Sequence, residues 1–161
     1  MPTVEALASA LRRRGWRIAT AESCTGGLVA AACTAIAGSS DWFDRGWVSY
    51  SNRAKTELLG VDPALIEAHG AVSEPVACAM ALGALARAPV DLTVAVTGIA
   101  GPGGATPGKP VGTVWLAVAR RDEASVAAPR TRRLQLPGDR SAVRAQTLQA
   151  ALQLLLDAAG A

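Results

Sequence analysis

The spacing of apolar residues divides the chain into alternating helices and strands. Apolar positions recur every three to four residues from Val4 to Leu11, which predicts an opening helix over residues 3–14 that ends at Gly15. The apolar run 16–20 then predicts a first strand, and the small residues after it predict a helix over about 26–35. A strand followed so closely by a helix is typical of α/β folds.

The rest of the chain contains further helices and strands. The pattern predicts, in chain order, a strand over 42–50 with a candidate bend at Gly46, helices over 53–59, 63–69 and about 73–86, strands over 92–96, 113–119 and about 131–136, and a final helix after Gly138-Asp139. A loop over 98–112, and no helix, joins two of these strands, so we expect part of the sheet to be antiparallel. We therefore predict a single three-layer α/β/α domain over residues 1–161, with a mixed sheet of about five strands, no linker and no internal repeat.

Composition narrows the range of partners. Half of the residues are hydrophobic but only 4% are aromatic, so Ala, Val and Leu must fill the core. The net charge is +3, and most of the arginines are scattered along the chain. A nucleic-acid-binding protein usually carries a basic stripe with interleaved aromatic residues, and neither is present. We expect no nucleic-acid partner, and the small positive excess fits an anionic small molecule.

The cysteines and the apolar runs indicate where such a protein works. Cys24, Cys33 and Cys78 are odd in number and unpaired in spacing, which argues against a disulfide framework, and a single histidine cannot build a metal site alone. No apolar run approaches the length of about 18 residues that a membrane helix needs, and the N-terminus does not resemble a signal peptide. We expect a cytoplasmic protein with no metal, no cofactor and no membrane partner.

The segment from Thr20 to Gly27 concentrates reactive groups where the first strand meets a helix. Its sequence, Thr-Ala-Glu-Ser-Cys-Thr-Gly-Gly, brings hydroxyls, a thiol and a carboxylate to one turn, and its glycines let the backbone approach a ligand closely. Such turns lie at the carboxyl edge of the sheet, where open α/β folds bind ligands. The alternative is a tight turn in which Ser or Thr only caps the helix.

The Gly- and Pro-rich loop over 98–112 resembles two nucleotide motifs and fulfils neither. Residues 103–109 match the first seven positions of a Walker A loop, but Pro110 stands where Ser or Thr should hold Mg²⁺, and a strand follows in place of a helix. The dinucleotide fingerprint that begins at Gly101 fails because Thr106 replaces its third glycine. A loop of this length usually serves a function, and its N–H groups could cradle a phosphate.

Amide hydrolysis at the turn would need a nucleophile and a base. Ser23, Cys24 and Thr25 are all candidate nucleophiles. Histidine is the usual base, but His69, the only one, stands between a predicted helix and a glycine, where a helix-end residue is the simpler interpretation.

A lysine can replace histidine as the base when desolvation lowers its pKa toward neutrality. Arginine cannot, because it stays protonated, so the base would be Lys55 or Lys109, the only two lysines. Lys55 follows the end of a predicted strand and could therefore lie near the turn. The alternative is a solvated residue on the surface of a helix.

Several motifs follow one another along the chain: residues 21–27, 38–40, 50–52 with Lys55, 70–73, 97–102 and 109–113. In sequence and in order, these motifs resemble the C-terminal domain family of CinA, whose stand-alone members are PncC-type nicotinamide-nucleotide amidases. The resemblance covers essentially the whole chain and departs from the family pattern at Ala105 and Gly108, in the glycine loop.

The resemblance implies hydrolysis of nicotinamide mononucleotide to nicotinic acid mononucleotide and ammonia, without metal, by a serine–lysine mechanism that falls on Ser23 and Lys55. Longer members carry an additional N-terminal domain with its own activity, which we do not assign to this chain. The substrate would be a small-molecule nucleotide, and we expect a homo-oligomer, either a dimer or a trimer. The alternative is a non-catalytic module that binds a nucleotide or phosphate and cleaves nothing.

The same resemblance suggests roles for the remaining site residues. We expect the Tyr50 hydroxyl to hold either Lys55 or the substrate, unless Tyr50 is only a half-buried strand residue. The phosphate would be bound by Arg140 or Arg144, if these are not surface residues, and by N–H groups of the glycine loop. The other expected substrate-binding residues are Cys24, Thr25, Gly26 and Gly27, whose N–H groups would stabilise the oxyanion, and Thr97, Gly98, Gly101 and Gly103 at the phosphate loop.

Overall fold

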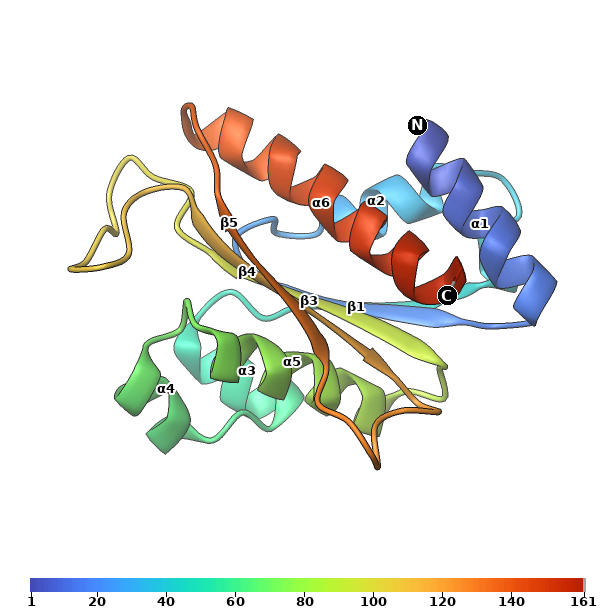
Figure 1. Cartoon of the computed structure of the whole chain (residues 1–161), viewed down its shortest axis with the longest axis horizontal. Helices are drawn as coiled ribbons and strands as arrows, with labels where there is room; N and C mark the ends of the chain where they lie inside the picture. Colours follow the sequence, from blue (N-terminus) through green and yellow to red (C-terminus); the bar gives the residue numbers. More distant parts are fainter. Residues whose placement is uncertain (161) are drawn as a thin grey trace.

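A computed structural model describes residues 1–160 and shows a domain built from helices and strands (Figure 1). The elements are α1 (Pro2–Arg14), β1 (Ile18–Glu22), α2 (Leu28–Thr34), the 3₁₀ turn η1 (Ser39–Asp41), β2 (Phe43–Val48), α3 (Asn52–Leu59), α4 (Pro63–His69), α5 (Glu74–Arg87), β3 (Leu92–Gly98), β4 (Thr113–Arg120), β5 (Arg130–Gln135) and α6 (Arg140–Gly160). Within residues 1–160, none of the helices combines the length and the apolar character that a membrane crossing requires.

The five strands form one mixed sheet in the order β2-β1-β3-β4-β5. β1 lies parallel to both β2 and β3, whereas β3–β4 and β4–β5 are antiparallel. The predicted antiparallel pairing is confirmed at the loop 98–112, which reverses the chain between β3 and β4 and protrudes from the body of the molecule (Figure 1). Because β1, β2 and β3 run in the same direction, their carboxyl ends meet at one edge of the sheet.

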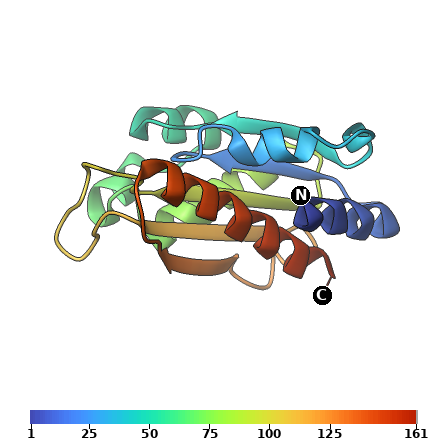
Figure 2. The ribbon, with the colours of Figure 1, turned by 90° about the horizontal axis from the view of Figure 1, so that it is seen from above.

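Helices cover both faces of this sheet, so the predicted three-layer α/β/α fold is confirmed (Figures 1 and 2). α1, α2 and α6 pack on one face and α3, α4 and α5 on the other. β3 alternates between the two cores: Leu92, Val94 and Val96 face α1 and α6, whereas Ala95 faces α5. Small residues on the second face let the Ala-rich α5 approach the strands closely.

The bounds of the predicted strands differ from those in the structure by one or two residues, and the differences at β1 and β2 bear on the site. β1 begins at Ile18, two residues later than predicted, and continues to Glu22, so the reactive turn begins only at Ser23. β2 ends at Val48. The Ser49 N–H group still donates to the Glu22 carbonyl on β1 at 2.9 Å, and Ser51 then caps α3. The predicted bend at Gly46 is wrong: the register shifts between residues 43 and 45, and Gly46 stays in the ladder, where a Cβ atom would lie 2.5 Å from Thr20 Oγ1.

Candidate active site

The turn after β1 sends neighbouring side chains to opposite faces of the sheet. The strand continues regularly up to Ser23, whose N–H group donates to the Val96 carbonyl on β3 at 3.0 Å. Because side chains alternate along a strand, Glu22 faces the layer of α2, whereas Ser23 faces α3. Gly26 and Gly27, with φ of 57° and 110°, then turn the chain into α2.

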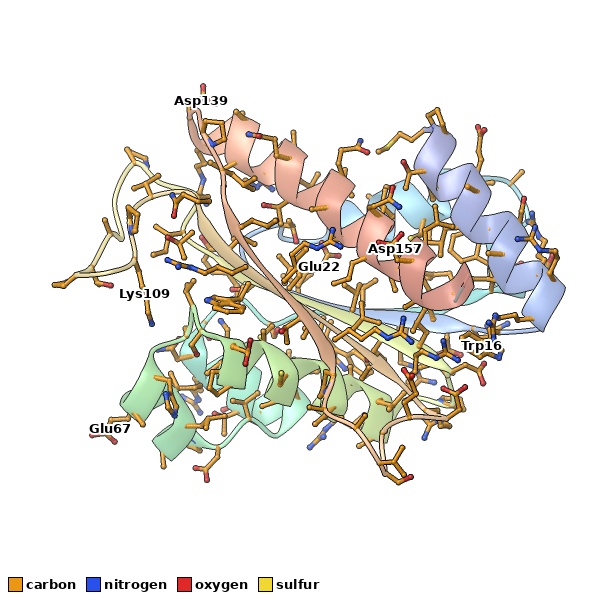
Figure 3. All side chains as sticks on the ribbon, in the orientation of Figure 1. Trp16, Glu22, Glu67, Lys109, Asp139 and Asp157 are labelled. Carbon is orange, nitrogen blue, oxygen red and sulfur yellow. The ribbon has the colours of Figure 1, made fainter. Side chains whose placement is uncertain are left out.

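Glu22 holds this turn in place from beneath. Its carboxylate is 1% exposed and accepts hydrogen bonds from the Thr25 hydroxyl at 2.6 Å and from the N–H groups of Val29 and Ala30 at 2.8 and 3.0 Å. It therefore caps α2, a task that the sequence assigned to Ser or Thr, while Gly27 occupies the cap position without a side chain. Figure 3 places Glu22 between the sheet and the layer of α2 and α6.

Ser23 and Lys55 meet on the other face. Lys55 Nζ lies 3.1 Å from Ser23 Oγ and donates to the Tyr50 carbonyl at 2.9 Å, and the same carbonyl lies 3.3 Å from Ser23 Oγ. Ser51 caps α3 by accepting from the Ala54 N–H group at 3.0 Å, which fixes the start of the helix that carries Lys55. The two groups, 32 residues apart in sequence, thus form a hydrogen-bonded pair.

Lys55 is not the solvated helix residue that the sequence left as an alternative. Its side chain is 1% exposed, and this burial lowers the pKa of the amine below its ordinary value of 10.5, while its electrostatic interaction with Cys24 opposes the shift. Removing a lysine from water disfavours its charged form because no solvent remains to stabilise the ammonium. A neutral amine in this position can accept the proton of the Ser23 hydroxyl.

The side chains of the other candidate nucleophiles, Cys24 and Thr25, are held in different ways. Burial raises the pKa of the Cys24 thiol to about 11, so the thiol stays protonated near neutral pH, and its Sγ atom packs against Gly98. The Thr25 hydroxyl donates to Glu22 and is fully buried. Among the three candidate nucleophiles, Ser23 is therefore the one whose side chain forms a hydrogen bond with the Lys55 amine.

The two alternative bases lie outside this site. His69 is exposed at the end of α4, as expected of a helix-end residue, and its carbonyl accepts a hydrogen bond from Lys109 Nζ at 2.5 Å. Neither side chain lines the cavity that contains Ser23. Lys55 is thus the base candidate that the fold places at the turn.

An oxyanion site requires backbone N–H groups that no other acceptor uses. Among residues 1–160, the N–H groups of Cys24, Thr25 and Gly27 donate to no oxygen, whereas that of Gly26 donates to the Ser23 carbonyl at 3.0 Å. Gly26 is therefore not available as a donor, contrary to expectation. Arg144 donates from Nε and Nη2 to the carbonyls of Cys24 and Thr25 at 3.1 and 3.3 Å, which orients these two peptide groups.

A cavity of about 180 Å³ opens in front of the pair, at the edge where β1, β2 and β3 end. It is lined by Ser23, Cys24, Tyr50, Asn52, Lys55, Ala71, Val72, Thr97, Gly98, Ala100 and Arg140. The predicted residues Thr97 and Gly98 belong to this lining, whereas Gly103 is exposed on the protruding loop and Gly101 is buried outside the lining. Sequence reasoning missed Asn52, Val72 and the positioning role of Glu22, although Asn52 and Val72 stand inside quoted motifs.

Tyr50 and Arg140 meet at the mouth of this cavity. The Tyr50 side chain is 56% exposed, and its hydroxyl accepts from Arg140 Nη2 at 3.2 Å, so it is the Tyr50 backbone, and not the hydroxyl, that contacts Lys55. Arg140 Nη1 also donates to the Gly101 carbonyl at 2.9 Å. The Arg140 guanidinium therefore contacts both Tyr50 at the mouth of the cavity and Gly101 in the glycine loop.

Cavity size alone would point elsewhere. A larger hollow of about 460 Å³ lies between α3 and α4, where Arg53, Thr56 and Ile66 belong to its lining, but it contains no nucleophile next to a buried base. Among residues 1–160, no group of three or more His, Cys, Asp or Glu side chains is arranged to hold a metal ion. The chemistry of the pair, and not the volume, identifies the candidate active site.

The fold and the site define a class of protein: an α/β domain in which a serine hydroxyl and a buried lysine amine meet where parallel strands end. The chain belongs to the CinA C-terminal domain family, whose pattern it matches over residues 2–159, as the resemblance of its motifs implied. It is 53% identical over 150 residues to "Nicotinamide-nucleotide amidohydrolase PncC" of Enterobacter agglomerans, which covers 93% of this chain and 89% of that protein. The protein of the same name from Escherichia coli (strain K12) is 51% identical over 155 residues, covering 96% and 92%.

Longer relatives and solved structures agree with this assignment. A "CinA-like protein" of Mycolicibacterium paratuberculosis is 60% identical over 141 residues, but the chain spans only 32% of its length. A CinA superfamily protein from Klebsiella pneumoniae superimposes with a TM-score of 0.92 at 39% identity, covering 99% of this chain and 96% of that one. A competence/damage-inducible protein from Agrobacterium tumefaciens gives 0.90 at 41% identity, with the same coverage.

Proposed function

We propose that this chain is a nicotinamide-nucleotide amidohydrolase that converts nicotinamide mononucleotide and water to nicotinic acid mononucleotide and ammonia. The observation that carries the proposal is the buried Lys55 amine 3.1 Å from the Ser23 hydroxyl. The names of the two enterobacterial relatives, which the chain matches over most of their length, support the same reaction.

Ser23 and Lys55 divide the reaction into two steps. Neutral Lys55 takes the hydroxyl proton as Ser23 Oγ attacks the carboxamide carbon. The π electrons of the carboxamide C=O bond move to the carboxamide oxygen, which becomes negatively charged. Lys55 returns the proton to the amide nitrogen, the C–N bond breaks, and ammonia leaves an ester on Ser23. A water molecule that loses a proton to Lys55 then attacks this ester, and Ser23 regains its proton as the acid is released.

The oxygen that becomes negatively charged would be bound by backbone N–H groups of the turn. Those of Cys24, Thr25 and Gly27 are unused among residues 1–160, and Arg144 holds the Cys24 carbonyl, which belongs to the same peptide group as the Thr25 N–H. Donors fixed in this way need no reorganisation during the reaction, and losing one typically costs about 10²–10³ in kcat.

The nucleotide part of the substrate would extend from the cavity past Arg140. The cavity of about 180 Å³ suits the pyridine carboxamide, and a neighbouring hollow of about 340 Å³ shares Ala100 and Arg140 with it. The phosphate would then meet Arg140 and the N–H groups of the loop that follows Gly98. Arg144 is the weaker candidate because its guanidinium already bonds two carbonyls of the turn.

A pair of variants tests this proposal. Ser23→Ala is expected to abolish ammonia release from nicotinamide mononucleotide, because the nucleophile is gone, whereas Cys24→Ala is expected to keep most of it. The reverse result would make the chain a thiol enzyme. Calorimetric binding of the mononucleotide by the unaltered chain, with no ammonia released, would favour the non-catalytic binding module instead.

The cytoplasmic setting and the homo-oligomeric state, a dimer or a trimer, remain predictions. Light scattering from the purified chain in solution measures the second of them directly.

A further inference from the structure

A second hollow lies on the same side of the sheet as the catalytic cavity but outside it. It has a volume of about 390 Å³, within the usual range for small-molecule sites. Three separate segments form it: residues 69–75 between α4 and α5, the part of the glycine loop at residues 108–109, and the adjacent strands β4 and β5. Its lining includes His69, Val72, Glu74, Lys109, Trp115 and Arg133.

Two cations at this hollow are available to an anion. Neither Lys109 nor Arg133 forms an ion pair within residues 1–160: Lys109 donates to the His69 carbonyl, and Arg133 has only a long contact of 3.5 Å to the Gly108 carbonyl. The Lys109 side chain extends from the loop toward α4 and α5 (Figure 3). The one carboxylate in the lining, that of Glu74, accepts a hydrogen bond from the Thr131 hydroxyl at 3.0 Å.

An aromatic wall stands beside these cations. Trp115 on β4 is half-buried and pairs directly across the ladder with Arg133 on β5. Directly opposite residues in an antiparallel pair lie on the same face of the sheet, so the indole and the guanidinium border the same space. A flat apolar surface next to two positive charges is the combination that recognises an aromatic ring carrying an anionic group.

The two sites share a wall. Val72 lines both the catalytic cavity and the second hollow. The segment that contains Val72 is held from both sides, by Lys109 at the His69 carbonyl and by the Thr97 hydroxyl, which donates to the Ala71 carbonyl at 2.8 Å. A ligand that draws Lys109 away from His69 would release one of these two restraints.

We propose that the hollow at Trp115 is an effector site for a nucleoside monophosphate, with the base on the indole and the phosphate at Lys109 and Arg133, and that its occupancy alters substrate binding in the adjacent cavity through Val72. The site is separate from the amide-cleaving pair. It uses residues to which the proposed reaction gives no role.

Calorimetry with AMP on the full chain carrying Ser23→Ala tests the site without turnover. We expect AMP to bind in the presence of saturating nicotinamide mononucleotide, and Arg133→Ala to weaken it by about tenfold or more, since a charge-assisted hydrogen bond is lost. Arg132→Ala is the matched control: its guanidinium lies 3.6 Å from Asp157, and it should leave AMP affinity unchanged. Adenosine and inorganic phosphate, each lacking half of the ligand, should bind at least about tenfold more weakly.

Three results would overturn the proposal: no AMP binding, an equal loss with Arg132→Ala and Arg133→Ala, or displacement of AMP by the mononucleotide. Displacement would place AMP in the catalytic cavity. With the unaltered Ser23, AMP should shift the KM for ammonia release, and Arg133→Ala should remove that shift. The binding measurements decide the site even if the chain releases no ammonia, so failure of the proposed function and failure of the effector site remain distinguishable.

Discussion

Replacing Lys55 with methionine removes the amine but keeps an unbranched side chain of similar reach in the same buried position. If Lys55 is the base, Ser23 then has no group to take its proton, because His69 and Lys109 lie outside the cavity and the Cys24 thiol stays protonated. Turnover of nicotinamide mononucleotide should fall while the substrate still binds.

The size of the loss follows from the geometry. A positioned general base contributes about 10²–10⁴ in rate, or roughly 3–5 kcal/mol of the barrier. Lys55 is the one amine beside Ser23, and the Tyr50 carbonyl that also contacts the hydroxyl is not basic enough to replace it. We therefore expect kcat to fall by about 10³ or more and KM to change by less than about threefold, because ground-state contacts remain.

The stability of the variant separates a chemical loss from a structural one. Lys55→Met removes two hydrogen bonds of about 1 kcal/mol each, but it also removes a buried amine. Because the folded pKa of Lys55 is lowered, the folded chain binds fewer protons than the unfolded chain between the lowered pKa and 10.5. The buried amine therefore costs stability in full below the lowered pKa, and progressively less between that pKa and 10.5. The variant should therefore melt at or above the temperature of the unaltered chain at pH 7.

The assay is ammonia release at saturating and limiting substrate, alongside a thermal melt and a calorimetric binding measurement. Lys55→Arg serves as the matched charged variant, since a guanidinium cannot act as a base at any accessible pH. Turnover within about fivefold of the unaltered chain in a folded Lys55→Met variant would refute the reasoning, because that loss is far below the contribution of a general base.

Three further predictions concern the same site. The value of kcat/KM should rise with pH through a pKa below 10.5 and then level off, because the proton that leaves Lys55 frees the base; a rate that falls over this range in a buffer series would contradict it. Arg140→Ala should raise KM for the mononucleotide by about tenfold and leave KM for nicotinamide riboside, which has no phosphate, unchanged in the same steady-state assay. Glu22→Ala should lower the free energy of unfolding by about 3 kcal/mol in a denaturant titration, since three donors lose their acceptor; a loss under about 1 kcal/mol would show that other groups hold the turn.

The fold could be predicted from the sequence because local patterns determine it. Local patterns located the α-helices and the strands but not the 3₁₀ turn η1, and the absence of a helix between residues 92 and 119 indicated the antiparallel half of the sheet. The bounds were less accurate where tertiary contacts decide them. β1 extends to Glu22 because its ladder with β3 continues to Val96, which no local signal shows.

The pairing at the site depended on long-range geometry that the sequence could not supply. The residues alone allowed three candidate nucleophiles and three candidate bases, and only the family resemblance selected Ser23 and Lys55. The burial of Lys55, the use of the Tyr50 carbonyl in place of its hydroxyl, and the contact between Arg144 and the turn 119 or more residues away all arise from packing between distant segments. No local pattern shows that Glu22 holds the turn, because the N–H groups of Val29 and Ala30 reach its carboxylate only in the folded protein.

The proposed mechanism requires a Lys55 amine that gives up its proton more readily than an ordinary lysine. The chain contains only two lysines, so lysine-selective isotope labelling gives two side-chain signals, and a Lys109→Arg variant assigns them. An NMR titration of these signals should place the pKa of Lys55 below 10.5, the ordinary value. A Lys55 signal that titrates at or above 10.5 in the folded protein would contradict the account.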